Sequence, residues 1–160
     1  MSGPRSYSTS DASEKPERSD AILSLKTVQK MLPLVQRIAK DILTHHRLII
    51  ELRPEEDSLD RQKRTLDWPQ RQRRYQIKEE LARSDRALQD AVAELHELGL
   101  SLLDESLGLI GFPTVVNNRR AFFSWHPGEK SLQNWQFEGE EVQRPIPPSW
   151  FKDASLSTNS

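Results

Sequence analysis

The sequence contains no cysteine, and this absence removes several kinds of site. Without a thiol the chain can form no disulfide, no thiolate zinc site and no cysteine nucleophile. It also has no apolar run near the roughly 18–20 residues that a membrane-spanning helix needs. The N-terminus lacks the apolar core of a secretory signal. These absences together predict a soluble cytoplasmic protein.

The sequence also has no excess charge of one sign. It carries 23 basic and 24 acidic side chains, a net charge of -1, so no global field attracts it to nucleic acid or to an anionic membrane. Hydrophobic residues are scarce at 35%, whereas a charged share of 29% and a mean hydropathy of -0.72 suit long, half-solvated helices. We expect one domain, residues 22–146, between a disordered N-terminal tail, 1–21, and a flexible C-terminal tail, 147–160.

The most regular apolar repeat lies in residues 24–52 and predicts a long amphipathic helix. Ser24 is its expected N-cap, and Pro33 predicts a kink or a restart within it. Pro54 predicts that this helix ends at about Leu52. The two apolar rows of the repeat are Val28, Val35, Ile42, Ile49 and, three residues later, Met31, Ile38, His45, Leu52.

A second apolar stripe spans residues 77–98, beyond a charged connection with Asp67-Trp68-Pro69 as the expected start of the next helix. The similar lengths predict an antiparallel, coiled-coil-like helical hairpin in which His45 faces Ile77. Each stripe would stay partly exposed, so we expect a homodimer or a protein partner that binds through the apolar stripes. A dimer that forms a four-helix bundle is the simplest case.

After Leu98 the apolar period changes from that of a helix to that of strands. Short apolar runs are separated by turn residues at Asn117-Asn118 and at Pro127-Gly128, while Pro113 is expected to end the first run. They predict a small antiparallel sheet of about three strands that packs on the helices, because so few strands rarely fold alone. The predicted fold is therefore α+β and mainly α.

The order of several short motifs over residues 23–147 resembles the bacterial domain of unknown function 2203 (DUF2203) family. The motifs are Leu23-Ser24-Leu25, Met31-Leu32-Pro33-Leu34-Val35, Glu97-Leu98-Gly99, Gly108-Leu109-Ile110, Phe112-Pro113, Trp125, Gly128-Glu129, Trp135 and Arg144-Pro145. The resemblance implies a helical pair followed by a small β region, and it implies no activity.

This chain departs from the family at polar positions that a metal or catalytic site would need. Gly111 stands where the family tends to have Asp, Ser124 where Cys is common, and Gln136 where His is common. His126 replaces an Arg, and Glu141-Val142 replaces a Gly-Phe step. The resemblance therefore brings no site residue to this sequence.

Arg119, Trp125, Glu129, Trp135 and Arg144 are the candidate ligand-binding residues of the β region. Guanidinium groups, tryptophans and a Gly-Glu turn are suited to a small anionic ligand or to an enzymatic pocket. The same residues are equally suited to fixing a small sheet onto helix ends. No elbow serine or glycine-rich phosphate loop is present, so we expect no catalytic residue, no metal site and no cofactor.

Two other charged features are candidate sites. Residues 61–74 form a basic run with Trp68 available to stack on a base, which is the best nucleic-acid candidate; the acidic residues 55–60 beside it can neutralise it. The adjacent His45 and His46 point about 100° apart on a helix and cannot share a metal ion. The leading hypothesis is a self-associating helical interaction or scaffold module without catalytic activity, with ligand binding by the β region and weak nucleic-acid binding as the alternatives.

Overall fold

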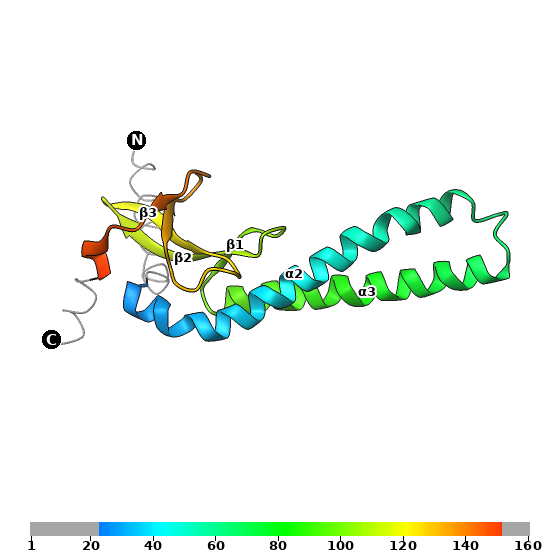
Figure 1. Ribbon diagram of the computed structural model, residues 1–160, viewed down its shortest axis with the longest axis horizontal. Helices are drawn as coiled ribbons and strands as arrows, with labels where there is room; N and C mark the ends of the chain where they lie inside the picture. Colours follow the sequence, from blue (N-terminus) through cyan, green and yellow to red (C-terminus); the bar gives the residue numbers. More distant parts are fainter. Residues whose placement is uncertain (1–22, 152–160) are drawn as a thin grey trace, which may run out of the picture.

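The computed structural model describes residues 23–151, which form two long helices followed by a five-stranded antiparallel sheet (Figure 1). This confirms the mainly helical α+β fold. Residues 1–22 and 152–160, which include most of the expected tails, lie outside the described part. The elements are α2 (Leu25–Arg61), α3 (Trp68–Glu97), β1 (Ser101–Asp104), β2 (Leu109–Val116), β3 (Arg119–Trp125), β4 (Asn134–Phe137) and β5 (Arg144–Pro145).

Helix α2 begins where the sequence predicts and ends later than it predicts. The Ser24 hydroxyl accepts a hydrogen bond from the Thr27 backbone N–H at 3.2 Å, as an N-cap does. The first turns, blue in Figure 1, run at an angle to the rest of the helix, as expected from Pro33. The helix then continues through Pro54 to Arg61, so the expected end at about Leu52 is wrong. Pro54 is exposed, and the carboxylates that follow it bind cationic side chains of α3.

Helix α3 starts at the expected residues with a complete capping box. The Asp67 carboxylate accepts from the Gln70 N–H at 2.9 Å, and the Gln70 side chain accepts from the Asp67 N–H at 3.0 Å. Because α2 is longer than expected, the antiparallel register also differs. Lys78 binds Glu56 at 3.0 Å, which places His45, eleven residues before Glu56, opposite Gln89 rather than Ile77.

The sheet is a meander in the order β1-β2-β3-β4-β5, with five strands instead of about three. The two missed strands, β1 and β5, have four and two residues and carry little periodic signal. Strand β2 runs through Pro113, which was expected to end it. Pro113 lies beyond the end of β1, where a missing N–H breaks no strand pairing, and its carbonyl accepts from the Leu23 N–H at 2.8 Å. The turn at Asn117 and Asn118 is confirmed, with φ of 54° and 61°.

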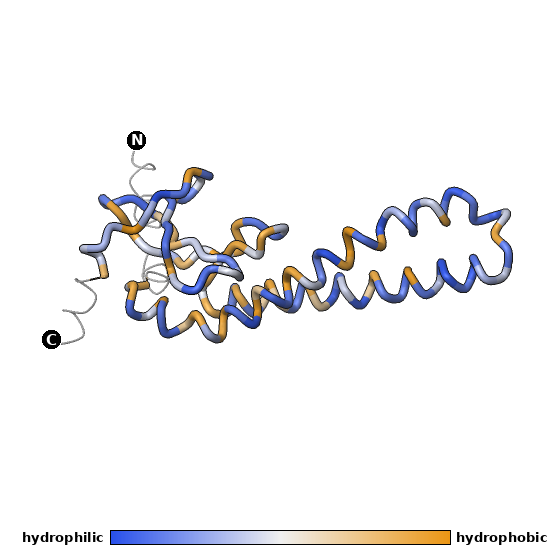
Figure 2. Tube along the Cα trace, in the orientation of Figure 1, coloured by the Kyte–Doolittle hydropathy of each residue, from blue (hydrophilic) through white to orange (hydrophobic). Residues whose placement is uncertain are grey.

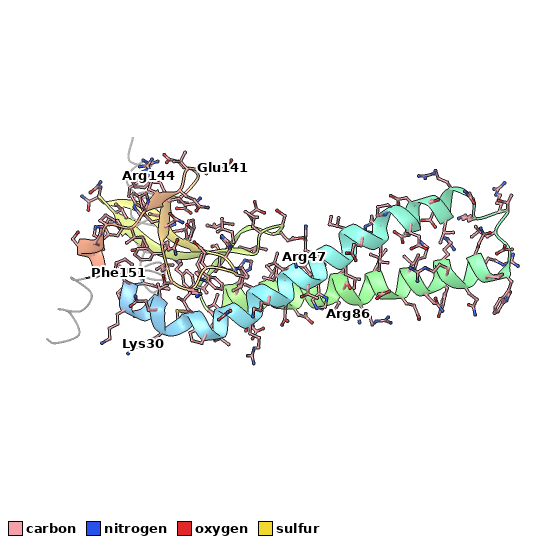
Figure 3. The ribbon with its side chains drawn as sticks, in the orientation of Figure 1. Lys30, Arg47, Arg86, Glu141, Arg144 and Phe151 are labelled. Atoms are coloured by element: carbon pink, nitrogen blue, oxygen red, sulfur yellow. The ribbon has the colours of Figure 1, made fainter. Side chains whose placement is uncertain are left out.

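One face of the sheet packs against the parts of α2 and α3 near the sheet, and this contact holds the main core. Its helical residues include Val28, Val35, Ile38, Ile42 and Leu95, and its sheet residues include Ile110, Phe112, Phe123, Trp125, Trp135 and Phe137. Beyond this core the hairpin projects alone, as Figure 1 shows. We call residues 47–86 the stalk; Arg47 and Arg86, labelled in Figure 3, mark where it leaves the sheet.

The stalk has only a small apolar seam. Leu52, Ile77 and Leu81 form its buried cluster, flanked by partly buried leucine and isoleucine side chains. Elsewhere its surface is mainly hydrophilic (Figure 2). No helix within residues 23–151 is long and apolar enough to cross a membrane.

Candidate functional site

Two of the candidate arginines meet at one acidic residue beside the sheet. Arg119 on β3 binds one carboxylate oxygen of Glu140 at 2.7 Å, and Arg144 on β5 binds the other at 3.3 Å. Arg144 pairs with Trp135 across the β4–β5 ladder, so its side chain lies on the same face of the sheet as Trp135, at the edge strand that Figure 3 shows far from the stalk. Two cations therefore share a single carboxylate, which leaves this cluster with an excess of positive charge.

Aromatic rings lie beneath these guanidinium groups. The Arg119 guanidinium is 4.0 Å from the centre of the Phe137 ring, and Arg144 is 5.1 Å from the same ring. Arg144 is also 5.4 Å from the Trp135 ring, which packs against Trp150 with ring centres 5.6 Å apart. Cation–π contacts of this kind orient the guanidinium groups at a half-exposed surface.

The other two candidates, Trp125 and Glu129, lie apart from this cluster, at the turn that follows β3. The Trp125 indole N–H donates to the Glu129 carbonyl at 3.0 Å. The Glu129 carboxylate accepts from the His126 backbone N–H, also at 3.0 Å, and lies 3.8 Å from the His126 Nε2. Each polar group here closes the turn, so the structure splits the five candidates into a cluster of three and a turn of two.

The opposite face of the sheet gathers three positions at which the chain departs from its family resemblance. Gly111 pairs with Ser124 across β2 and β3, and Gln136 lies diagonally from Ser124 on β4. Ser124 and Gln136 are buried, and neither the Ser124 Oγ nor the Gln136 Oε1 has a hydrogen-bond partner among the described residues. A glycine, a hydroxyl and an amide therefore lie together on this face of the sheet.

A groove between the two helices and the β1–β2 turn was not predicted from the sequence. It has a volume of about 520 Å³, and it is open to solvent along one side. The groove is lined by Ile49 and Arg53 of α2, by Asp85, Leu88, Gln89, Val92, Ala93 and His96 of α3, and by Glu105 of the turn. We call this set the hairpin groove.

The hairpin groove has an apolar floor and charged edges. Ile49, Leu88 and Val92 are only partly buried. Arg53 and Asp85 face each other across the groove at 3.7 Å. At its other end, Glu105 binds the His46 Nδ1 at 2.7 Å, and this contact holds the β1–β2 turn against α2. The α3 spacing 85, 89, 92, 96 is visible in the sequence as a second helical stripe, but the contact between residues 46 and 105 is not.

Two arginines of the basic run are neutralised by α2. Arg73 makes two hydrogen bonds of 2.9 Å to Glu55, and Arg74 binds Asp60 at 2.6 Å. The Arg74 hydrogen bond holds the pKa of Asp60 below its ordinary value, and the Arg73 hydrogen bond does the same for the pKa of Glu55. Four cations at the end of the stalk are exposed: Arg61, Lys63, Arg64 and Arg71.

Comparison with known proteins gives one match. A family model described as "Uncharacterized conserved protein (DUF2203)" matches residues 22–143 and confirms the family resemblance. No curated protein and no solved structure matches the chain. Among residues 23–151, no three His, Asp or Glu side chains are grouped so that they could hold a metal ion.

Proposed function

Since the chain belongs to the DUF2203 family, whose description assigns no activity, we propose a function from the geometry: the protein is a self-association module that acts through its helical hairpin. The sheet fixes the base of the hairpin, and the stalk extends into solvent. A cytoplasmic location and an interaction or scaffold role without catalysis complete the proposal.

The hairpin groove is the observation that carries this proposal. A two-helix seam can bury only one stripe of each helix, and α3 has a second, adjacent stripe that includes the half-buried Val92 and the exposed Ala93. In a four-helix bundle each helix buries two such neighbouring stripes. A second hairpin would supply the missing cover for Ile49, Leu88 and Val92.

Native mass spectrometry over a range of protein concentrations tests this proposal. We expect a dimer that dissociates on dilution. Ala93→Arg places a charge at the groove and should shift the protein to monomer. Gln76→Arg adds the same charge at an exposed position of α3 about 160° around the helix from Val92, and it should remain a dimer. A protein that stays monomeric at every concentration would overturn the proposal.

The arginine cluster supports a second candidate function, the binding of a small anionic ligand. Arg119 and Arg144 already hold one carboxylate between them, and their rings of Phe137 and Trp135 fix their orientation. Trp125 and Glu129 would take no part in this site. The test is calorimetric titration of the protein and of Arg119→Ala with phosphate and with a dicarboxylate. Binding that disappears in the variant at unchanged melting temperature supports a ligand site. A loss of stability in the variant, with no binding by either protein, supports a structural role.

A further inference from the structure

We propose that the stalk end of one copy docks into the hairpin groove of a second copy, so that two antiparallel stalks exchange contacts around a twofold axis. This inference rests on the proposed self-association and specifies the surfaces that make it. We call Leu66, Trp68, Arg71 and the cations at 61, 63 and 64 the stalk tip.

The stalk tip presents an aromatic anchor on a well-ordered support. Trp68 is the first residue of α3, and it is 64% exposed. The capping box at Asp67 fixes the backbone on one side of it, and Leu66 is buried, with 5% exposure, just before that cap. The backbone at position 68 is therefore already ordered before binding, and tryptophan is among the residues most enriched at the energetic centres of interfaces.

Charge complementarity selects the groove as the surface that receives the tip. The tip carries four exposed cations, and its one carboxylate, Asp67, is used by the helix cap. Two carboxylates, Asp85 and Glu105, and one arginine, Arg53, line the groove, so carboxylates exceed cations there by one. The C-terminal end of α3, which is the negative end of the helix dipole, also lies at the groove, where His96 is a lining residue. A basic tip and an acidic groove attract each other between two copies and repel tip from tip.

The spacing along α3 fits an antiparallel overlap of two stalks. When position 68 of one copy is level with position 88 of the other, antiparallel geometry places Arg71 of the first copy level with Asp85 of the second. Residues 68–88 of the two α3 helices then overlap over about 30 Å at 1.5 Å per residue. This overlap brings both tips to both grooves.

The β1–β2 turn limits this overlap. Glu105 binds His46, and Gly108 packs near Leu43, so the turn lies across α2 at the base of the groove. A partner helix can approach along the stalk as far as this turn and no farther. The twofold axis repeats the contact, so one surface pair forms a closed dimer rather than a chain of copies.

The absence of cysteine permits a direct test by crosslinking. Thr65→Cys places a single thiol at the tip, and Ala93→Cys places one in the groove. We expect a short thiol-specific crosslinker to join a mixture of these two variants efficiently. A mixture of Thr65→Cys with Gln76→Cys is the control and should stay unjoined. A dimer by native mass spectrometry in which tip and groove do not crosslink would overturn this inference and leave the self-association proposal intact; a monomer would overturn both.

Further variants test the chemistry of the contact. Trp68→Ala should raise the dimer dissociation constant by about 30-fold or more, as expected for an interface tryptophan, while the melting temperature extrapolated to the monomer stays unchanged. Val142→Ala removes a comparably exposed side chain, 60% against 64%, from the loop between β4 and β5 and should leave the dissociation constant as it was. Arg71→Glu and Asp85→Arg should each weaken the dimer, and their combination should restore it. Additive losses in the combined variant would contradict the pairing.

Discussion

Gly111 occupies a point where two strands bring side chains too close for a Cβ atom. A Cβ built on it would lie 2.9 Å from a Phe122 ring carbon and 3.0 Å from both methyl groups of Leu103. The surrounding face also holds the buried Ser124 and Gln136. Any larger side chain at position 111 therefore needs its neighbours to move.

We expect Gly111→Ala to lower the free energy of unfolding by about 1–3 kcal/mol, the usual cost of overpacking. Chemical denaturation followed by circular dichroism measures this quantity. Val115→Ala, which truncates an exposed side chain on the same strand, is the control and should change it by about 0.5 kcal/mol or less. A Gly111→Ala protein as stable as the parent would show that the Phe122 and Leu103 side chains can move aside at no cost in stability.

At this scale the sequence predicted local turns and helix caps, but it did not predict which residues from distant segments come into contact. The Asn117-Asn118 turn, the Ser24 cap and the start of α3 at Asp67 depend on neighbours within three residues, and all were predicted. The meeting of Gly111 with Ser124, or of Arg119 with Glu140, depends on strand register and loop path. These contacts depend on how all the strands pair, and the sequence of one segment does not determine that pairing.

Helix α2 shows how contacts between elements overrule a local signal. Pro54 removes one hydrogen bond, and this cost predicts an early end of the helix. Ion pairs from the next two turns to α3, made by Glu55, Glu56 and Asp60, are possible only if α2 stays helical. The sequence predicted that the acidic residues 55–60 can neutralise the basic run, and the ion pairs of Arg73 and Arg74 confirm this; it did not show which residues pair. The same pairs occupy Arg73 and Arg74, which lowers the charge available for a nucleic acid.

These ion pairs predict that the stalk opens more readily in acid. The pKa of Asp60 lies below its ordinary 3.8 and that of Glu55 below its ordinary 4.5, first because each accepts a hydrogen bond from an arginine. A carboxylate with a lowered pKa stabilises the folded state above its ordinary pKa, and this stabilisation is lost as the pH falls through the lowered value. We expect amide exchange in the stalk, corrected for intrinsic rates, to accelerate below about pH 4 relative to the sheet.

The double variant Glu55→Gln, Asp60→Asn is the matched control for this pH dependence. It should exchange faster than the parent at pH 7, because the ion pairs are already absent. Its stalk protection should then change little on acidification. Equal protection of parent and variant at pH 7 would show that the pairs contribute nothing measurable, which is the common result for exposed ion pairs.

At the scale of the whole molecule, the sequence predicted the helical hairpin followed by a sheet, but it did not predict the groove between the hairpin and the β1–β2 turn. Periodicities of helix and strand are long-range patterns within one segment, and they gave the hairpin followed by a sheet. The hairpin groove arises where Glu105 of the β1–β2 turn meets His46 of α2, and it needs the correct register of α2 on α3. The predicted register placed His45 opposite Ile77, so the groove residues were not brought together.

The division into a base and a stalk predicts that the base folds without the stalk. The main core joins residues 25–42 of α2 and residues 91–95 of α3 to the sheet, while the stalk contributes a separate cluster of three buried side chains. Replacing residues 50–83 by a short Gly/Ser turn should therefore keep the sheet and a shortened hairpin. Circular dichroism should show cooperative thermal unfolding, and native mass spectrometry should show a monomer, because the tip is gone and the groove is cut. An unfolded product would mean that the base depends on the stalk cluster, and a dimeric product would place the self-association surface on the sheet.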